Sequence, residues 1–121
     1  MQELQAVLSA LQTIRAPRTT SEYDLHALVG EALSRASLPC RHEVPLAPRQ
    51  RIDFACGPIG VEVKRGKPAL SPLLRQLTAY AASEAVSALV LVADRPPRLP
   101  DTVMGKPLLV VSLSKLWGIA L

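Results

Sequence analysis

Arg51-Ile-Asp-Phe-Ala-Cys56 and Ile59-Gly-Val-Glu-Val-Lys64, separated by Gly57-Pro58, form the stretch of sequence that decides the fold. Both segments are short and rich in apolar residues, and the glycine and proline between them indicate a turn. They predict two neighbouring strands of a hairpin. Arg41-His-Glu-Val-Pro-Leu46, which ends before Ala47-Pro48, has the same character, so we expect three consecutive strands in a meander.

Two helices are expected before these strands. Over residues 2–14, apolar side chains recur at the spacing of an amphipathic helix, which Ala16-Pro17 ends, and this N-terminal helix is assigned to residues 1–16. A second helix begins after Ser21, a suitable N-cap residue. Its apolar stripe ends at Leu38-Pro39 and consists of Leu25, Leu28, Val29, Ala32, Leu33 and Ala36.

After the strands, Ser71-Pro72 favours a helix start, with Ser71 as the N-cap and Pro72 at the first helical position. The nearly continuous apolar segment of residues 86–93 is typical of a central strand that is covered on both faces. Residues 94–106 are rich in proline and predict a loop. Residues 108–113 predict one more buried strand, and a short helix over residues 114–121 would carry Trp117.

At 121 residues, the chain has room for a single compact domain. Hydrophobic residues make up 49% of it and aromatic residues only 3%, so the core must be aliphatic, which suits an α/β protein. The third helix joins two strands as a crossover. We therefore expect an αβββαβ core over about residues 20–113, with a mixed sheet flanked by helices and an extra N-terminal helix.

The chain is basic, with 14 Lys and Arg against 10 Asp and Glu and a net charge of +4, which is compatible with a polyanionic partner. The amino terminus is too polar for a signal peptide, and no apolar run approaches the ~20 residues of a membrane span. We therefore expect a cytoplasmic protein without a membrane partner. Several basic residues crowd the middle third of the chain: Arg41, Arg49, Arg51, Lys64, Arg65, Lys67 and Arg75.

Cys40 and Cys56 are the two cysteines of the chain, and they lack the spacing of a zinc site or an iron–sulfur cluster. We expect two reduced and mostly buried thiols, because a free cysteine behaves as a small apolar residue. A disulfide or a reactive cysteine is the alternative.

Glu62 and Lys64 must project from the same face of their strand, because side chains alternate along a strand. If the two strands pair as a hairpin, Asp53 lies opposite the neighbourhood of Glu62. Mg²⁺ prefers oxygen ligands and often binds one or two carboxylates, waters and a substrate phosphate. Asp53 and Glu62 therefore form a candidate site for Mg²⁺, or Mn²⁺ as a substitute, with the backbone carbonyl of Val63 as a third ligand. Lys64 would orient or help to deprotonate the attacking water and counter the charge on the phosphate.

Ile52-Asp53 and Glu62-Val63-Lys64, set in this order of helices and strands, resemble the PD-(D/E)XK nuclease superfamily over roughly residues 20–113. The motif proline of the superfamily is replaced by Ile52, a common relaxation. The resemblance implies a restriction-endonuclease-like fold and Mg²⁺-dependent hydrolysis of phosphodiester bonds in DNA. The structural alternative for the acids and the lysine is a solvated sheet face with a cross-strand salt bridge.

The first core helix of this superfamily usually contributes a glutamate, and Glu22 and Glu31 are the candidates. They are nine residues apart, so they lie on opposite faces of a helix. The apolar stripe lies about 50° from Glu22 and about 130° from Glu31. Glu22 is therefore the predicted catalytic and metal-binding glutamate, with an interaction with the helix dipole as its alternative role.

Gln76 and Tyr80 reproduce the Q-x3-Y pattern that RecB-type nucleases of the superfamily carry. The spacing puts both on one helix face, where Gln76 would position Lys64 or a phosphate and Tyr80 would pack beside it. Phosphate contacts are expected near the acids, so the predicted DNA-binding set is Arg51, Arg65, Lys67, Arg75 and Tyr80. Three further polar residues could act near the metal or DNA but are expected to be ordinary surface side chains: His26, His42 and Glu43.

These residues favour a Mg²⁺-dependent deoxyribonuclease of DNA repair, recombination, or phage or mobile-element DNA processing. Two subtypes are open: a structure-selective endonuclease similar to archaeal-type Holliday-junction resolvases, acting as a homodimer, and an end-processing or single-strand nuclease closer to the RecB type. The alternatives are a catalytically silent DNA-binding or assembly module that keeps the fold, and an accessory protein whose partner docks on residues 2–14. No small-molecule cofactor is expected.

Overall fold

The computed structural model describes residues 2–16 and 21–116, which form four helices and six strands. The helices are α1 (Gln2–Leu11), α2 (Glu22–Arg35), α3 (Leu70–Ala81) and α4 (Leu113–Leu116). The strands are β1 (Cys40–Ala47), β2 (Gln50–Cys56), β3 (Ile59–Lys64), β4 (Ala88–Ala93), β5 (Thr102–Val103) and β6 (Lys106–Ser112).

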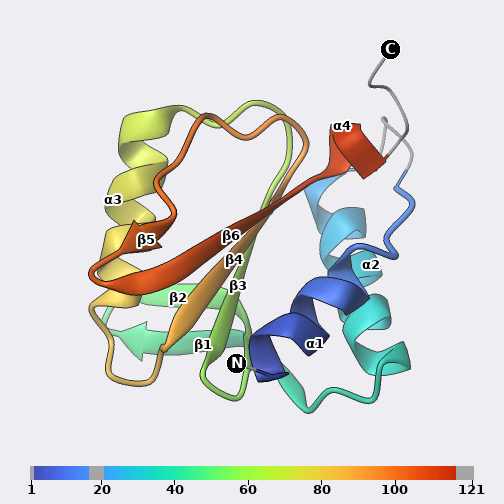
Figure 1. The fold of residues 1–121 in the computed structure, drawn as a ribbon, viewed down its shortest axis with the longest axis horizontal. Coiled ribbons are helices and arrows are strands. Elements are labelled where there is room, and N and C mark those ends of the chain that lie inside the picture. Colours follow the sequence, from blue (N-terminus) through green and yellow to red (C-terminus); the bar gives the residue numbers. More distant parts are fainter. Residues whose placement is uncertain (1, 17–20, 117–121) are drawn as a thin grey trace.

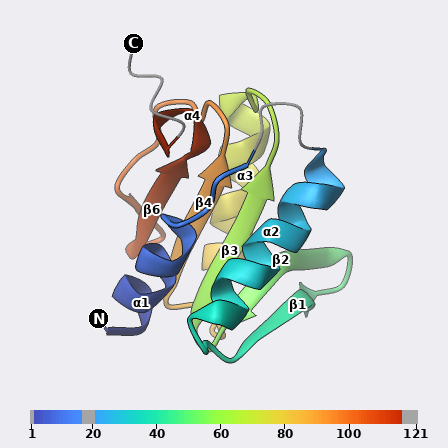
Figure 2. The same cartoon turned by 90° about the vertical axis from the view of Figure 1, so that its right-hand side faces the viewer.

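The strands form one mixed sheet in the order β1-β2-β3-β4-β6-β5. β1, β2 and β3 pair antiparallel as the predicted meander, and β3, β4 and β6 pair in parallel. α1 and α2 cover one face of the sheet, and α3 covers the other (Figures 1 and 2). The expected mixed sheet flanked by helices, with an extra N-terminal helix, is therefore confirmed.

The sheet separates two apolar cores. Leu25 and Val61 belong to the core under α1 and α2, whereas Leu77 and Leu89 belong to the core under α3. Every residue of β4 is buried, as its continuous apolar sequence predicts for a strand that is covered on both faces. No helix in the described part of the chain is long and apolar enough to cross a membrane.

The N-cap of α2 agrees with the prediction from the sequence, and that of α3 does not. Ser21 caps α2 as predicted, because its Oγ accepts a hydrogen bond from the backbone N–H of Asp24 at 3.1 Å. α3 instead begins at Leu70, two residues before the predicted first helical residue Pro72, and its N-cap Ala69 makes no side-chain hydrogen bond. Pro72 then falls at the third helical position, which is tolerated because the first four N–H groups of a helix have no partner within it.

Two further boundaries differ from the prediction. The expected loop over residues 94–106 contains the short strand β5, in which Thr102 and Val103 pair with β6. α1 ends at Leu11, three residues before the apolar periodicity ends, although Ile14 is still buried. The predicted C-terminal helix begins at residue 113, and Trp117 lies outside the described residues.

Cys40 and Cys56 form a disulfide, so the expectation of two reduced thiols is wrong. The two residues lie directly opposite each other in the pairing of β1 with β2, an alignment that their spacing of 16 residues did not reveal. The bond therefore closes the open end of the β1–β2 hairpin. Disulfides are uncommon in a reducing cytosol, so this bond and the expected cytoplasmic location point in different directions.

Reduction of the disulfide should lower the free energy of unfolding by about 3 kcal/mol, because it releases a closed loop of moderate length in the unfolded chain. Urea denaturation with and without a reductant measures the difference, and thiol titration of the unreduced protein reports the starting state. Two titratable thiols in protein prepared without reductant, with no change in stability on reduction, would contradict this assignment.

Gly60 lies in β3, where side chains of both neighbouring strands approach its backbone closely. A Cβ at this position would overlap Ile52 Cδ1 and lie 3.0 Å from Leu89 Cδ2, and both of these side chains are fully buried. In α2, a Cβ on Gly30 would lie 3.6 Å from Cε2 of Phe54, an ordinary contact. The two glycines therefore form a matched pair for testing the packing of the two cores.

Gly60→Ala should destabilise the fold by about 1–3 kcal/mol through overpacking, whereas Gly30→Ala should leave it unchanged or stabilise it by up to about 1 kcal/mol through helix propensity. Chemical denaturation of the two variants beside the parent protein gives both values. Equal stability of the two variants would show that β3 does not pack as closely as described.

Candidate functional site

The candidate site lies where β2 and β3 separate, a region that we call the fork. Backbone pairing of these strands extends to Phe54 and Val61. Beyond that pair, hydrogen bonds between side chains and backbone connect the two strands. Asp53 Oδ2 accepts a hydrogen bond from the backbone N–H of Val63 at 2.7 Å, and the backbone N–H of Asp53 donates to Glu62 Oε1 at 3.4 Å. The two predicted metal-binding carboxylates therefore lie side by side.

Lys64 shares one face of β3 with Glu62, as strand alternation predicts. Its Nζ lies 3.3 Å from Glu62 Oε2. Glu62 is buried, with 3% of its surface exposed, whereas the Lys64 side chain is 29% exposed. The ammonium group can therefore contact a ligand that approaches from solvent while it stays beside the buried carboxylate.

The surroundings of Glu62 disfavour its ionised form. Desolvation by burial, followed by the negative charge of Asp53, raises the pKa of Glu62 from 4.5 to about 8, although Lys64 acts in the opposite direction. Opposite charge nearby favours the ionised form of a carboxyl group. A divalent cation at the fork would thus relieve the repulsion that these two carboxylates exert on each other.

The backbone of Val63 also faces the fork. In an extended strand, the N–H and C=O of one residue point toward the same neighbouring strand, and the N–H of Val63 points to Asp53. Within residues 2–16 and 21–116, no three His, Cys, Asp or Glu side chains form a group that could hold a metal. A cation at the fork would therefore use Asp53, Glu62, the Val63 carbonyl and water, a donor set that suits Mg²⁺.

β2 changes face at Asp53. Ile52 packs in the core under α3, whereas Phe54 packs in the core under α1 and α2, although residues two apart in a regular strand share a face. On β1, Glu43 falls between the pairs His42–Phe54 and Val44–Ile52 and has a φ of +54°, in the left-handed region that is unusual for a glutamate. Backbone strain of this kind persists where the surrounding structure enforces it and is frequent at functional sites.

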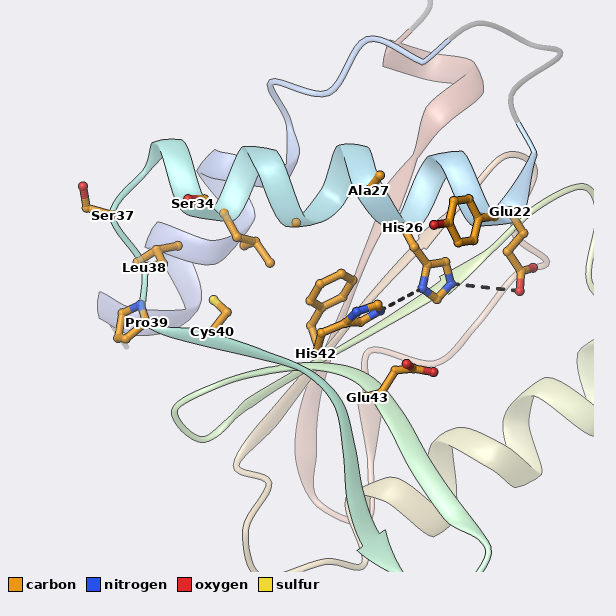
Figure 3. Close-up of a pocket in the computed structure, with 14 residues that line it drawn as sticks. Glu22, His26, Ala27, Ser34, Ser37, Leu38, Pro39, Cys40, His42 and Glu43 are labelled. Carbon is orange, nitrogen blue, oxygen red and sulfur yellow. Dashed lines mark hydrogen bonds and ion pairs between the residues drawn. The ribbon is translucent and has the colours of Figure 1, made fainter.

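The first turns of α2 bring two more polar side chains to the fork, those of Glu22 and His26, which Figure 3 shows side by side. Glu22 Oε1 accepts a hydrogen bond from the backbone N–H of Arg65 at 3.4 Å, although the Glu22 side chain is 56% exposed; Glu31 is exposed as well. His26 Nε2 lies 3.7 Å from Asp53 Oδ2 and 4.0 Å from Glu22 Oε2, and its side chain is 18% exposed. The expectation that His26 is an ordinary surface residue is therefore wrong.

His42 extends this group of side chains away from the fork. Its Nε2 lies 3.4 Å from Nδ1 of His26 (Figure 3), and its ring stacks on Phe54 with a centroid distance of 4.5 Å and an interplanar angle of 16°. His42 and Glu43 are exposed, as expected for surface residues. A continuous series of side chains thus runs from Asp53 through His26 to an aromatic surface.

The chain just after Lys64 is held by Asp94, which the sequence patterns did not single out. Asp94 is 7% exposed at the end of β4, forms an ion pair with the Arg65 guanidinium, and accepts a hydrogen bond from the backbone N–H of Gly66 at 2.7 Å. The available signal was an acid directly after an all-apolar strand, since a buried carboxylate needs a partner. Arg65 therefore has a structural role in this pairing, and its contact with DNA stays a prediction.

Gln76 and Tyr80 share one face of α3 as predicted, and Gln76 Nε2 donates to the Tyr80 hydroxyl at 2.9 Å. The hydroxyl donates in turn to the backbone carbonyl of Arg51 at 3.0 Å. Burial, followed by the charges of Glu62 and Asp53, raises the pKa of Tyr80, so the hydroxyl stays protonated. Tyr80 is 2% exposed, and the prediction that it contacts DNA is corrected, because its burial leaves no surface for a base.

The remaining predicted residues lie around this core of the site. Gln76 and Lys64 line a small cavity of about 400 Å³ at the start of α3, although the Gln76 amide is bonded to Tyr80. Arg51, Lys67 and Arg75 are exposed, so their charges are accessible to a polyanion. Their contact with DNA remains a prediction.

Comparisons of the chain with models of protein families, with curated proteins and with solved structures found no match. The function proposed below therefore rests on the geometry and chemistry of Asp53, Glu62 and Lys64 and of the side chains that hold them.

In metal-free protein, stability should fall as the pH rises from about 5 to 9. The folded-state pKa of Glu62 is raised to about 8, so the stabilisation from its protonated form is present below pH 4.5 and is lost as the pH passes through 8. Glu62→Gln should remove this part of the pH dependence and should be more stable than the parent at pH 9.

Thermal denaturation in EDTA across this pH range provides the measurement. Glu31→Gln is the matched control for Glu62→Gln, because it makes the same chemical change at an exposed glutamate. A parent protein whose stability does not change with pH, or an E31Q variant that matches E62Q, would show that the fork does not disfavour the charge on Glu62.

Proposed function

We propose that this chain is a Mg²⁺-dependent deoxyribonuclease with a restriction-endonuclease-like fold, a member of the PD-(D/E)XK superfamily. The observation that carries the proposal is the meeting of Asp53, Glu62 and Lys64 at the fork. Two carboxylates held beside each other, one of them buried, are oxygen ligands of the kind that a hard cation such as Mg²⁺ prefers. The neighbouring ammonium group supplies the positive charge that phosphate chemistry needs.

Asp53 and Glu62 would hold the cation with the Val63 carbonyl and water, and Glu22 on α2 would extend this metal shell. When bound, Mg²⁺ supplies Lewis-acid activation of the phosphate and lowers the pKa of a bound water. The backbone N–H of Val63 donates a hydrogen bond to Asp53 Oδ2 at 2.7 Å. This bond fixes the orientation of the Asp53 carboxylate before a cation binds. Ordered ligands of this kind reduce the reorganisation that binding requires.

Lys64 would act on the scissile phosphate itself. In the reaction, water attacks phosphorus, the bond from phosphorus to the leaving oxygen breaks, and the products are a phosphomonoester and a hydroxyl group. Negative charge grows on the phosphate oxygens in the transition state, where the Lys64 ammonium can stabilise it. The ion pair with Glu62 at 3.3 Å keeps the ammonium in place. The contacts of Asp94 with Arg65 and Gly66 hold the chain that follows Lys64.

The substrate proposed is DNA, contacted outside the fork by the exposed basic residues Arg51, Lys67 and Arg75. The net charge of +4 supports binding to a polyanion without specifying its sequence. Both subtypes, a structure-selective endonuclease that acts as a homodimer and an end-processing or single-strand nuclease, use the same fork. Cleavage assays on linear, flapped and four-way DNA separate them.

The ion pair of Lys64 with Glu62 favours one alternative, a DNA-binding or assembly module without turnover. In that case the pair would serve only to neutralise a buried acid. Metal-dependent cleavage of any of these DNAs excludes the alternative, whereas DNA binding without cleavage supports it.

Lys64→Ala should reduce Mg²⁺-dependent cleavage by more than about a hundredfold, because it removes a charge that stabilises the transition state. DNA affinity should change by no more than a few-fold, since binding draws on several exposed basic residues. Gel-based cleavage assays and fluorescence anisotropy in Ca²⁺ measure the two effects.

Lys115→Ala is the control for this experiment, because Lys115 is an exposed lysine on α4. It should cleave at the parental rate. Cleavage by K64A within about threefold of the parent would remove Lys64 from the mechanism, because loss of a transition-state charge has a larger effect.

A further inference from the structure

A groove with a volume of about 960 Å³ runs between α2 and β1 and opens beside the fork. Glu22 and His26 lie at the end near Asp53, and Leu38 and Pro39 lie at the far end (Figure 3). The volume falls within the range of small-molecule sites, roughly 300–1,000 Å³. The groove is therefore large enough for one or two nucleobases but too small in volume for a double helix.

Four rings are among the side chains that line the groove: those of Tyr23, His26, His42 and Phe54. The stacked rings of His42 and Phe54 lie 4.5 Å apart, and the His26 ring centroid lies 5.6 Å from that of His42. Tyr23, which also lines the groove, is 84% exposed. Exposed aromatic and imidazole rings offer faces on which a nucleobase stacks, and the imidazole nitrogens can hydrogen-bond to its edge.

The charge of the groove selects for the base rather than the phosphate backbone. The described residues that line it include Glu22 and Glu43 but no lysine or arginine. Phosphates would be repelled from such walls, whereas an uncharged heterocycle would not. The backbone of a strand bound here would stay outside, on the side of Asp53 and Lys64, while a base enters the groove.

We propose that the groove between α2 and β1 holds an unpaired nucleobase next to the phosphate that the fork cleaves. The inference rests on the proposed nuclease function and specifies its substrate class as single-stranded or frayed DNA. Bases within an intact duplex are paired and stacked, and removing one from the stack costs a few kcal/mol. Single strands present their bases without that cost, so the groove favours them.

The test compares a fluorescein-labelled twelve-nucleotide single strand of thymidines with a twelve-base-pair duplex, using anisotropy in Ca²⁺ so that binding is measured without cleavage. Three variants alter the lining of the groove: Tyr23→Ala, His42→Ala and Ala27→Trp. The first two remove a ring, and the third adds a large side chain at a lining position of α2. Each should weaken single-strand binding by about tenfold, the size expected for loss of one stacking contact. Duplex binding should change by less than about twofold, because base stacking does not contribute to it.

Two controls separate the groove from stability and from general surface effects. His42→Phe keeps the ring that stacks on Phe54 and should retain most of the single-strand affinity. Met104→Ala removes a side chain that is 60% exposed in the turn between β5 and β6 and should bind both DNAs as the parent does. Circular dichroism of all variants identifies any that fail to fold, and Ala27→Trp remains informative if His42→Ala does not fold.

The outcomes distinguish this inference from the nuclease proposal. If the parent cleaves DNA and the groove variants bind single strands as well as the parent does, the groove inference is wrong and the nuclease proposal stands. If the parent cleaves nothing but its single-strand affinity still depends on the groove, the nuclease proposal fails and the groove is a base-binding site. A parent dimer that Ala27→Trp converts to a monomer would assign the groove to a second copy of the chain and overturn the inference.

Discussion

Two hydrogen bonds between side chains and backbone hold the point at which β2 and β3 separate, and the candidate site depends on them. Asp53 accepts from the N–H of Val63 at 2.7 Å, and Glu62 accepts from the N–H of Asp53 at 3.4 Å. Each carboxylate satisfies a backbone donor beyond the last regular pair of the two strands. The consequence is that two acids lie together in a largely buried place, which raises the pKa of Glu62 to about 8.

The same irregularity connects the fork to the groove. Because β2 reverses its facing at Asp53, Ile52 joins the core under α3 while Phe54 turns toward α2 and supports the ring of His42. A regular strand would put both residues on one face. The groove would then lack the Phe54 ring on which His42 stacks. The buried strand β4 behind the fork, together with Asp94 at its end, supplies the rigid support that a precisely arranged site requires.

Much of this arrangement follows from the sequence, because it depends on local periodicity. The hairpin turn at Gly57-Pro58 sets the register that places Asp53 near Glu62, and strand alternation puts Lys64 beside Glu62. Helical geometry distinguishes Glu22 from Glu31 because the apolar stripe of α2 fixes which side faces the sheet. These features need no knowledge of contacts between distant segments.

Features that depend on distant segments could not be predicted in the same way. The disulfide, the pairing of Arg65 with Asp94 and the approach of His26 to Asp53 join elements 16, 29 and 27 residues apart. Tyr80 was predicted at the right position but in the wrong role, because periodicity shows which residues share a face and not how deeply that face is buried.

The central claim is that Asp53 and Glu62 hold a divalent cation at the fork. Anomalous diffraction from a crystal of the protein soaked in Mn²⁺ tests it most directly. We expect a peak bound by both carboxylates, and the loss of that peak in Asp53→Asn. A Mn²⁺ peak elsewhere on the chain, or none at concentrations that support DNA cleavage, would contradict it.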